Sequence, residues 1–443
     1  MSVQQILYNL AIPNTNKMYC PSTKNKALIP LNKGNEQLHC YDLQSKGWSM
    51  GISKDINEIS KIWDSIAPAN NIFLQSDYLK ALHAHPATHM GFRYAVLFRD
   101  EKPIGIVFLQ TYWVRMQDSI NKNKTEKPKN FIQRTGVALR EWFIRKAVFN
   151  VLICGNLLLT GKHGYYIDPT VDEGTAAEIA RQAVDLAQRL LEKESGKNIH
   201  IQMFKDYPCK DKNSPIDPVL KKASYHSYTI QPAMYMRLPK HWNSFDDYLE
   251  EMQSKYRVRA RRAAKKGEEL NKRELTLEEI EAMNGEIYAL YKGIATNVGF
   301  NAFTLHPEYF LALKKHLGER FKLVGFFLEG RLVAFCTSIF NGRELEAHFL
   351  GVDHEVNREY QVYLNILYSL IDMAIYHKMD SVDFARTALE IKSSVGAVPC
   401  DLNIYVRHRN RISSNMIKFI FEYLTPEEEW QPRSPFKDMD VVK

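Results

Sequence analysis

The chain has 443 residues, of which 45% are hydrophobic and 25% are charged. This composition excludes a disordered or collagen-like chain, and the length predicts two domains of roughly 200 residues each. The formal net charge of +8 is moderate, and the six cysteines form neither a CxxC motif nor a cysteine–histidine pair with metal spacing. We therefore expect reduced cysteines and no bound metal.

Neither a secretory signal nor a membrane span is evident. The N-terminus lacks a basic stretch followed by a long apolar run, and no apolar run approaches the roughly 20 residues that cross a bilayer. We therefore expect a cytoplasmic protein, with a peripheral contact to the inner face of the membrane left open.

The first half begins with an expected irregular N-terminal extension at residues 1–45, where few periodic signals occur. Regular patterns follow, and the segments FRYAVLFR and IGIVFLQTYWV, separated by the turn-prone DEKP, predict a β-hairpin. The remaining expected elements are a strand at 47–52, helices at 54–67 and 76–85, a basic amphipathic helix at 131–149, a strand at 151–160, a helix at 173–194 and a strand at 199–204.

An uneven charge pattern marks the stretch WNSFDDYLEEMQSKYRVRARRAAKKGEEL, for which we predict one uninterrupted helix from residue 242 to 270. Ser244 is suited to cap its first turn, and Asp246 and Asp247 follow where the helix dipole favours negative charge. From Lys255 to Lys266, seven of twelve residues are Lys or Arg and none is acidic.

At 3.6 residues per turn these cations form two stripes beside an apolar face. Lys255, Arg259, Arg262 and Lys266 form the first stripe, and Arg257 lies on the second. Like charges at i,i+4 cost about 0.2–0.5 kcal/mol per pair, so an anionic partner would supply the missing counter-charge. We therefore predict that Arg257, Arg259, Arg262 and Lys266 bind substrate, with an ordinary solvated helix as the alternative.

The second half repeats the order of the first. Its expected elements are a strand at 233–238, helices at 277–296 and 306–318, a hairpin at 321–340, a strand at 344–352, a helix at 358–378 and strands at 381–386 and 402–409. The repetition predicts two similar α/β units at 46–232 and 233–425, the second carrying the basic helix at 244–270, and a C-terminal tail at 426–443.

Two helices, an antiparallel hairpin, a further strand, a helix and closing strands are the element order of the GNAT acyltransferase fold. Its duplication, with the inserted KYRVRARRAAKKGEEL and the hairpin segment EGRLVAF, resembles the Fem-like and related GNAT-like N-acyltransferases. In DFARTALEIKSSVGA, the residues Asp383, Lys392 and Gly396 match the family's pattern of a strand, a variable loop and a Lys shortly before Gly. The resemblance spans roughly residues 47–410 and is specific from about 242 to 400. It implies two tandem GNAT-like units, each a mixed sheet flanked by helices.

One departure from the simple GNAT pattern bears on the donor. Such enzymes cradle the coenzyme A pyrophosphate in a (Q/R)xxGx(G/A) loop after the fourth strand, and here HEVNREYQVYLN contains no glycine. The resemblance implies an acyl-CoA or acyl carrier protein thioester as the donor, and the missing loop also fits an aminoacyl-tRNA. In each case the donor's carrier is anionic, which suits the basic helix.

Acyl transfer to an amine needs an acid or base with an adjusted pKa and a polarised carbonyl. In this fold the reacting groups lie where the central strands splay apart, which directs attention to Glu346 and His348. They are two positions apart on a strand and so share a face, and polar groups there are costly unless paired or used. We predict that both are catalytic and that Asp383, Arg386 and Lys392 bind substrate, with a structural histidine and strand-end ion pairs as alternatives.

The sequence thus favours an N-acyltransferase that moves an acyl or aminoacyl group to an amine on a lipid or cell-envelope precursor. The expected acceptor is an amine-bearing lipid of lipid biosynthesis or a peptidoglycan precursor. Two alternatives remain open. One is a Fem-type aminoacyl-tRNA-dependent peptidoglycan cross-bridge transferase. The other is a non-catalytic module that binds a polyanion or a membrane surface.

Overall fold

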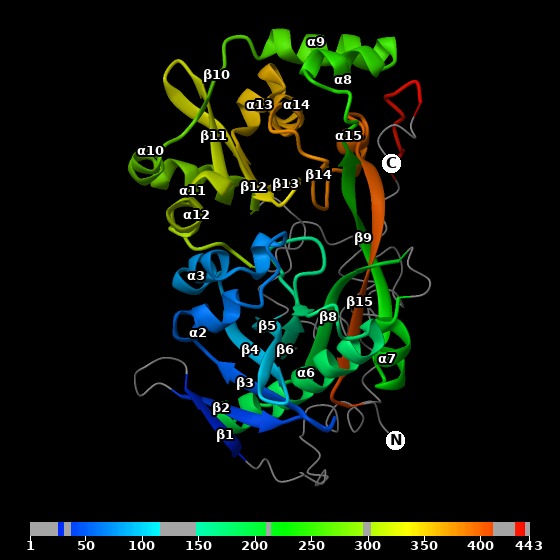
Figure 1. Ribbon diagram of the computed structural model, residues 1–443. Coiled ribbons are helices and arrows are strands. Elements are labelled where there is room, and N and C mark those ends of the chain that lie inside the picture. Colours follow the sequence, from blue (N-terminus) through cyan, green and yellow to red (C-terminus); the bar gives the residue numbers. More distant parts are fainter. Residues whose placement is uncertain are drawn as a thin grey trace, which may run out of the picture.

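The strands join into one continuous mixed sheet of 15 strands flanked by helices (Figure 1). The computed structural model describes residues 25–30, 37–115, 148–209, 214–295, 303–410 and 430–438. The order across the sheet is β1-β2-β3-β4-β5-β6-β8-β15-β9-β14-β13-β12-β11-β10, and β7 pairs with β5. The α/β class and the mixed sheet flanked by helices are therefore confirmed, but the two expected sheets are joined into one.

The first half contributes strands β1 (Asn25–Pro30), β2 (Gln37–Asp42), β3 (Trp48–Ser53), β4 (Met90–Arg99), β5 (Lys102–Arg115), β6 (Val148–Cys154), β7 (Tyr165–Ile167), β8 (Ile201–Pro208) and β9 (His226–Arg237). Its helices are α2 (Ile56–Asp64), η1 (Ile72–Leu74), α3 (Ser76–Ala84), α6 (Glu173–Ser195) and α7 (Ile216–Lys222). The expected hairpin is β4–β5, and the expected helix at 173–194 is α6. The helix expected at 131–149 lies outside the described residues.

The second half contributes strands β10 (Asn271–Glu274), β11 (Phe321–Leu328), β12 (Arg331–Asn341), β13 (Glu344–Val352), β14 (Ser381–Asp383) and β15 (Val398–His408). Its helices are α8 (Phe245–Glu251), α9 (Ser254–Lys266), α10 (Leu277–Ala282), α11 (Asn284–Ala295), α12 (Tyr309–Leu317), η3 (Gly318–Arg320), α13 (His354–Tyr360), α14 (Val362–Tyr376) and α15 (Leu389–Ser393).

The same topology occurs in both halves. Three antiparallel strands, β4-β5-β6 in the first half and β11-β12-β13 in the second, are followed across the sheet by a parallel neighbour, β8 or β14. Each half therefore contains a pair of parallel central strands. We call each such pair a fork, because one strand continues past the point where the pairing ends.

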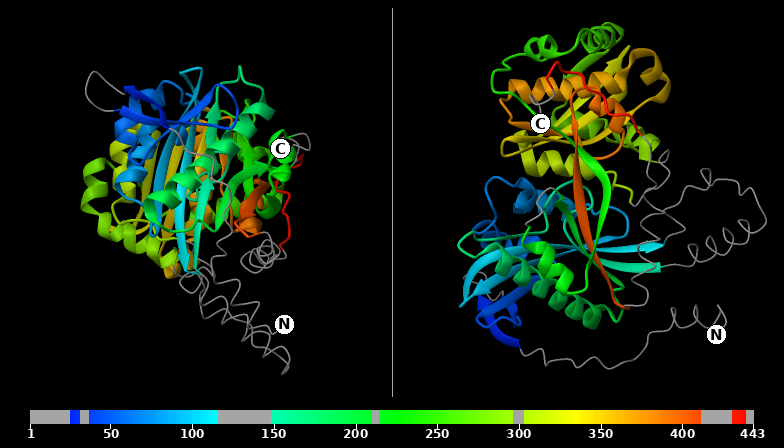
Figure 2. Two further views of the ribbon diagram at one scale, coloured as in Figure 1. Left: turned by 90° about the horizontal axis from the view of Figure 1, so that it is seen from below. Right: turned by 90° about the vertical axis from the view of Figure 1, so that its right-hand side faces the viewer.

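Two long strands connect the halves (Figure 2). Strand β9 pairs with β14 of the second half, whereas β15, near the end of the chain, pairs with β8 of the first half. The two strands also pair with each other from Val398–Tyr235 to Val406–His226. The expected boundary at residues 232 and 233 thus falls inside β9, and the halves exchange strands, which a division by sequence alone did not anticipate.

The core is divided by the sheet. One cluster packs α2, α3 and α12 on one side of both halves, with Trp63 and Phe310 fully buried. A second surrounds α14 and the apolar face of α9, and a third lies beneath α6. The cluster that spans both halves holds them together by apolar burial at roughly 25 cal/mol per Å².

Several sequence expectations need correction. Residues 1–45 are not wholly irregular, because β1 pairs with β2, and Leu38 and Cys40 of β2 are buried. The helices expected at 277–296 and 358–378 are each divided in two, the latter at Gln361, which has a left-handed φ of 52°. Sequence periodicity does not reveal such breaks, because the apolar positions on either side keep their helical spacing.

The predicted uninterrupted helix at 242–270 is also two helices. Met252 is extended, with ψ 146°, and separates α8 from α9. It forms a bridge with Phe436, while the Gln253 amide donates to the Pro435 carbonyl oxygen at 2.8 Å. The C-terminal segment 430–438 therefore supplies the backbone partners that interrupt the helix, and this part of the expected tail is packed structure.

Phe436 explains the glycine of the Lys-before-Gly motif. Its ring is 1% exposed, and a Cβ built on Gly396 would lie 2.4 Å from it. Gly396 also has φ +108°, which side-chain-bearing residues rarely adopt.

Within the described parts of the chain, no helix has the length and apolar character that a membrane span requires.

Candidate active site

The fork of the second half places two carboxyl groups side by side. Strands β13 and β14 pair in parallel over three positions, the last being Glu346 with Asp383. There β14 ends, whereas β13 continues to Val352. The side chains of Glu346 and Asp383 are 2% and 8% exposed. Two acids are therefore buried where the strands separate.

Hydrogen bonds from both halves fix Asp383. The Thr160 hydroxyl, on the loop after β6, donates to Asp383 Oδ2 at 2.5 Å, and the Ala385 amide donates to Oδ1 at 2.7 Å. Burial raises the pKa of Asp383 despite these donors. Burial, together with the charges of Asp383 and Glu344, raises the pKa of Glu346 well above its ordinary value. The fork therefore favours retention of a proton on this pair.

Lys392 of α15 is buried next to the acids. Its Nζ donates to the carbonyl oxygens of Phe384 at 2.6 Å and Arg386 at 2.7 Å. Burial lowers its pKa to about 7, although Asp383 and Glu346 both act to raise it. Both the ammonium and the amine form are therefore accessible near neutral pH, as acid–base catalysis requires.

A second group of charges lies between the halves. Arg386 donates to both carboxylate oxygens of Asp206, at 2.7 and 3.0 Å, and Lys205 is bonded to the same carboxylate. Burial acts to raise the pKa of Asp206, but Lys205 and Arg386 outweigh it and leave the pKa lowered. Burial lowers the pKa of Lys205 to about 8. This paired network ties β8 of the first half to the loop after β14.

The backbone around these groups adopts rare conformations. Ala385, Thr387 and Ala388, between β14 and α15, have φ values of 55°, 70° and 50°, and Asp206 has φ 64°. Such left-handed non-glycine residues cost about 1–3 kcal/mol each and gather at functional sites. The carbonyl contacts of Lys392 and the bidentate grip of Arg386 hold the strained loop in place.

His348 is bonded to a tyrosine and not to the acids of the fork. Its Nε2 is 2.8 Å from the Tyr309 hydroxyl on α12, and its buried Nδ1 has no partner among the described residues. The register of β12 and β13 shifts between Cys336 and Ser338, so the alternation of side chains along β13 is broken near His348. Burial lowers the pKa of His348 to about 3, which leaves the ring neutral at physiological pH.

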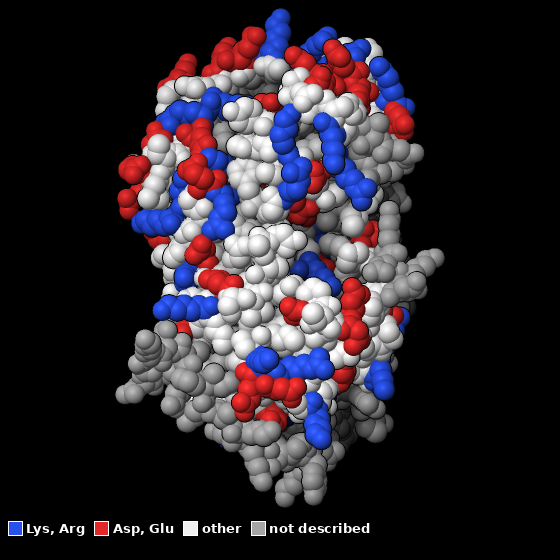
Figure 3. All heavy atoms as spheres, in the orientation of Figure 1, with Lys and Arg blue, Asp and Glu red and all other residues white. Residues whose placement is uncertain are grey.

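The predicted substrate-binding residues fall into two places. Asp383, Arg386 and Lys392 join the fork, together with Glu346. The cations of α9 lie outside it: Arg262 and Lys266 are exposed, and half-buried Arg257 donates to the Glu250 carbonyl oxygen at 3.4 Å. Arg259 lines a surface pocket beside α15. Lys and Arg side chains gather with acidic ones over the upper part of the molecule, where α8, α9 and α13 lie, while the middle of the same face is largely uncharged (Figure 3).

The helices that follow the fork strands are capped by the protein's own carboxylates. Asp353 accepts from the Glu355 and Val356 amides at the start of α13, and Asp172 accepts from the Thr175 amide at the start of α6. An anion gains most at such a terminus when the amides are free. Here an aspartate already occupies each one, which agrees with the absence of a glycine-rich loop in the sequence.

Sequence reasoning missed Thr160, Lys205 and Asp206. Lys205 and Asp206 directly follow the expected strand IHIQMF, and two adjacent charges at the end of a strand are a signal that could have been noticed. Nothing in the sequence connects Thr160 with Asp383, 223 positions away. The described residues contain no group of three or more His, Cys, Asp and Glu side chains arranged to hold a metal ion.

Comparison with known proteins agrees with this geometry. Residues 254–393, which include α9, the fork of the second half and Lys392, match the family described as Acetyltransferase (GNAT) domain. No curated protein matches the chain. The crystal structure of FemX is similar with a TM-score of 0.51 and 13% identity, over 82% of this chain and 98% of FemX.

Two further solved structures are similar at lower scores. A tandem GNAT protein from the clavulanic acid biosynthesis pathway has a TM-score of 0.46 and 8% identity, over 82% of this chain and 99% of that one. L-PGS from Bacillus licheniformis has a TM-score of 0.41 and 9% identity, over 79% and 95%. The matched model identifies a GNAT-type domain at residues 254–393, which supports an acyltransferase, and the similarity to FemX shows a shared fold.

Proposed function

We propose that the protein transfers an acyl or aminoacyl group from an activated donor to an amine on a lipid or cell-envelope precursor, and that the chemistry takes place at the fork of β13 and β14. The observation that carries this proposal is the group formed by Glu346, Asp383 and Lys392. These three ionisable side chains are buried together at the opening of the strands, with pKa values shifted toward one another. Such shifts are typical of acid–base sites.

The reaction needs two proton transfers. The acceptor amine attacks the acyl carbonyl and loses a proton, and the leaving thiol or hydroxyl gains one. We assign the first proton to the Glu346 and Asp383 pair and the second to the Lys392 ammonium. A general acid or base contributes typically 10²–10⁴-fold to rate. His348 is bonded to Tyr309, and we assign it a structural role in place of the catalytic one that the sequence suggested.

The carrier of the donor must be bound somewhere other than the two capped helix starts. With Asp353 and Asp172 on those amides, the α9 cations that lie beside α15, Lys255 and Arg259, are the better site for an anionic carrier. Coenzyme A, an acyl carrier protein and a tRNA all meet this requirement. The fold shared with FemX makes a Fem-type aminoacyl-tRNA-dependent cross-bridge transferase the second candidate.

The experiment compares lipids and peptidoglycan precursors from a strain that lacks the gene with those from strains restored with the wild type or with Lys392→Met. We expect a free amine to accumulate in the deletion strain and the matching amide to return only with the wild type. The chemistry of that amide separates the candidates, because an aminoacylated muropeptide identifies the Fem-type activity and a fatty amide identifies lipid acylation. Identical profiles in all strains would contradict the proposal.

A further inference from the structure

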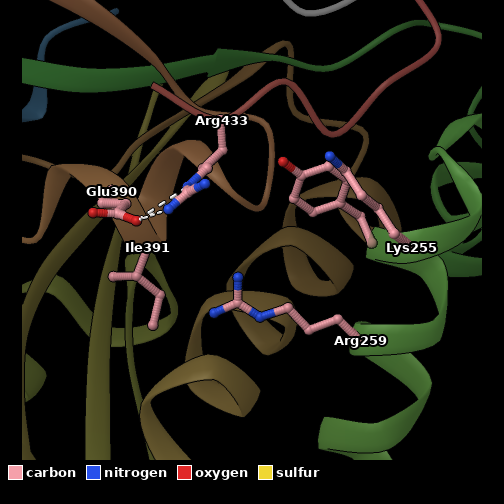
Figure 4. A pocket seen from close by; sticks show the side chains of 6 residues that line it. Lys255, Arg259, Glu390, Ile391 and Arg433 are labelled. Atoms are coloured by element: carbon pink, nitrogen blue, oxygen red, sulfur yellow. Dashed lines mark hydrogen bonds and ion pairs between the residues drawn. The ribbon is translucent and has the colours of Figure 1, made fainter. Parts of the chain in front are cut away.

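A pocket with a volume of about 400 Å³ lies between α9 and α15, away from the buried acids of the fork. Figure 4 shows that its walls come from three separate segments of the chain. The N-terminal part of α9 and the start of α15 form two walls, and the C-terminal segment 430–438 forms the third. The lining residues are Lys255, Tyr256, Arg259, Glu390, Ile391 and Arg433.

The charges in this pocket are unbalanced. Arg433 is paired with Glu390, its Nε lying 3.0 Å from Oε1. Lys255 lies over the Tyr256 ring, 4.8 Å from its centroid. Among the residues that the structure describes, neither Lys255 nor Arg259 forms an ion pair, so three cations face one carboxylate. The pocket carries an excess of two positive charges.

We propose that this pocket binds a phosphate ester group of a substrate, held by Lys255, Arg259 and Arg433. A phosphate monoester carries close to two negative charges at neutral pH, which matches the excess. Guanidinium groups bind phosphate oxygens through paired N–H donors, and two of the three cations are arginines. Arg433 exchanges the Glu390 carboxylate for the phosphate when the ligand binds.

The position of the pocket connects it to the reaction. Glu390 and Ile391 line it from α15, and the next residue of the same helix, Lys392, belongs to the fork. A phosphate in the pocket therefore anchors a substrate against the element that carries the proposed acid. This inference rests on the proposed function for its substrate, but the binding itself is measured without turnover.

The test measures binding of inorganic phosphate to the full-length protein by isothermal titration calorimetry. Removing a charge-assisted contact from phosphate weakens binding by about tenfold or more, and we expect this for Arg259→Gln and for Arg433→Gln. Arg261→Gln is the matched control, because Arg261 is an exposed cation of the same helix that does not line the pocket. We expect its affinity to stay within about twofold of the wild type.

Glu390→Gln gives a change of opposite sign. It frees Arg433 and removes the negative charge, so we expect phosphate to bind more tightly by several-fold, whereas Glu268→Gln, an exposed carboxylate just beyond α9, leaves the affinity unchanged. A purely structural ion pair would instead lower the melting temperature of Glu390→Gln without strengthening binding. No measurable phosphate binding, or equal losses in Arg259→Gln and Arg261→Gln, would overturn the proposal.

Competition identifies the source of the phosphate. Displacement of inorganic phosphate by coenzyme A assigns the pocket to a donor carrier, and displacement by glycerol 3-phosphate assigns it to a lipid acceptor. Competition by neither compound would overturn the assignment to a phosphate ester.

If phosphate binds as expected while Lys392→Met leaves turnover intact, the proposed chemistry fails and the pocket stands. If turnover is lost in Lys392→Met and phosphate does not bind, the pocket fails alone.

Discussion

The two halves of the molecule have equivalent forks with different side chains. In the first half, β6 and β8 pair in parallel up to Cys154 and Phe204, and Cys154 occupies the place that Glu346 has in the second half. Burial raises the pKa of the Cys154 thiol, which is fully buried. In the second half the same position carries an acid beside Asp383. The last pair of the first fork thus carries no charge, and the buried Lys205 and Asp206 follow it on β8, whereas the last pair of the second fork consists of two acids.

The first half still contributes to the second fork. Its Thr160 donates to Asp383, and its Asp206 binds Arg386. The two halves therefore have different roles. The fork of the second half carries the proposed chemistry, and the first half supplies hydrogen bonds and charges that fix the side chains of this fork. Substitutions in each half should accordingly have different effects on turnover and stability.

The largest expected effect is on turnover in the second half. Lys392→Met removes the proposed acid, and we expect turnover to fall by about 10²-fold or more. Melting temperature measured on the same preparation shows how much of the loss is due to unfolding. Should Lys392→Met fail to fold, Glu346→Gln, which keeps the side-chain shape, is expected to cause a similar loss. Near wild-type turnover in a folded Glu346→Gln protein would remove the pair from the reaction.

Breaking the connection between the halves should mainly lower stability. Asp206→Asn leaves Arg386 and Lys205 without their buried carboxylate, which costs about 3–5 kcal/mol in the free energy of unfolding. Asp77→Asn is the control, because Asp77 forms an exposed ion pair with Arg320 across the same two halves and its loss should cost less than about 1 kcal/mol. Urea unfolding measures the free energy of unfolding of both variants. Equal losses would show that the buried network stabilises the protein no more than the exposed ion pair does.

Stability should also depend on pH through the buried lysines. The folded pKa values of Lys392 and Lys205 are lowered to about 7 and about 8, from an ordinary 10.5. Between those values and 10.5 the unfolded chain binds more protons, so their contribution to the free energy of unfolding rises with pH. Urea unfolding at pH values of about 7 and about 9 should show this rise. Lys392→Met and Lys205→Met should each reduce it, and an unchanged slope in both variants would contradict the burial of these charges.

His348→Ala tests the structural role of the histidine. The Tyr309 hydroxyl loses its hydrogen bond to His348, which costs about 1–3 kcal/mol, and turnover should fall only with the folded fraction. Tyr309→Phe removes the same hydrogen bond from the other side and should behave alike. A loss of turnover by about 10²-fold in folded His348→Ala protein would restore the histidine as a general base.

The smallest effect is expected at the first fork. Cys154→Ala removes the thiol at the position equivalent to Glu346, and we expect turnover within about twofold of the wild type, since a small buried substitution typically costs only about 1 kcal/mol. Turnover is measured at a temperature well below the melting point of the variant. A tenfold loss without unfolding would show that the first half also takes part in the chemistry.

Much of the fold could be read from the sequence, because its signals are local. The alternating runs of β4, β5, β11 and β12 and the spacing of apolar residues in α6 depend only on neighbouring positions. Glu346, Asp383 and Lys392 were also singled out as candidate site residues. A charged residue within an apolar strand, or a lysine shortly before a glycine in a motif, can be recognised from the sequence alone. These signals sufficed for the GNAT-like order and for four of the fork residues, Glu346, Asp383, Arg386 and Lys392.

The tertiary structure decided which of these groups meet and in what state. The pairing of Thr160 with Asp383 spans 223 positions, and the break at Met252 depends on a segment more than 180 residues later. Neither leaves a local pattern. The exchange of β9 and β15 likewise depends on how the halves pack. Burial sets the pKa of Lys392, Glu346 and His348, and burial is a property of the packed chain, because desolvation depends on every neighbour that excludes water. The sequence thus determined the residue types and their order along each element, while packing determined their partners and charge states.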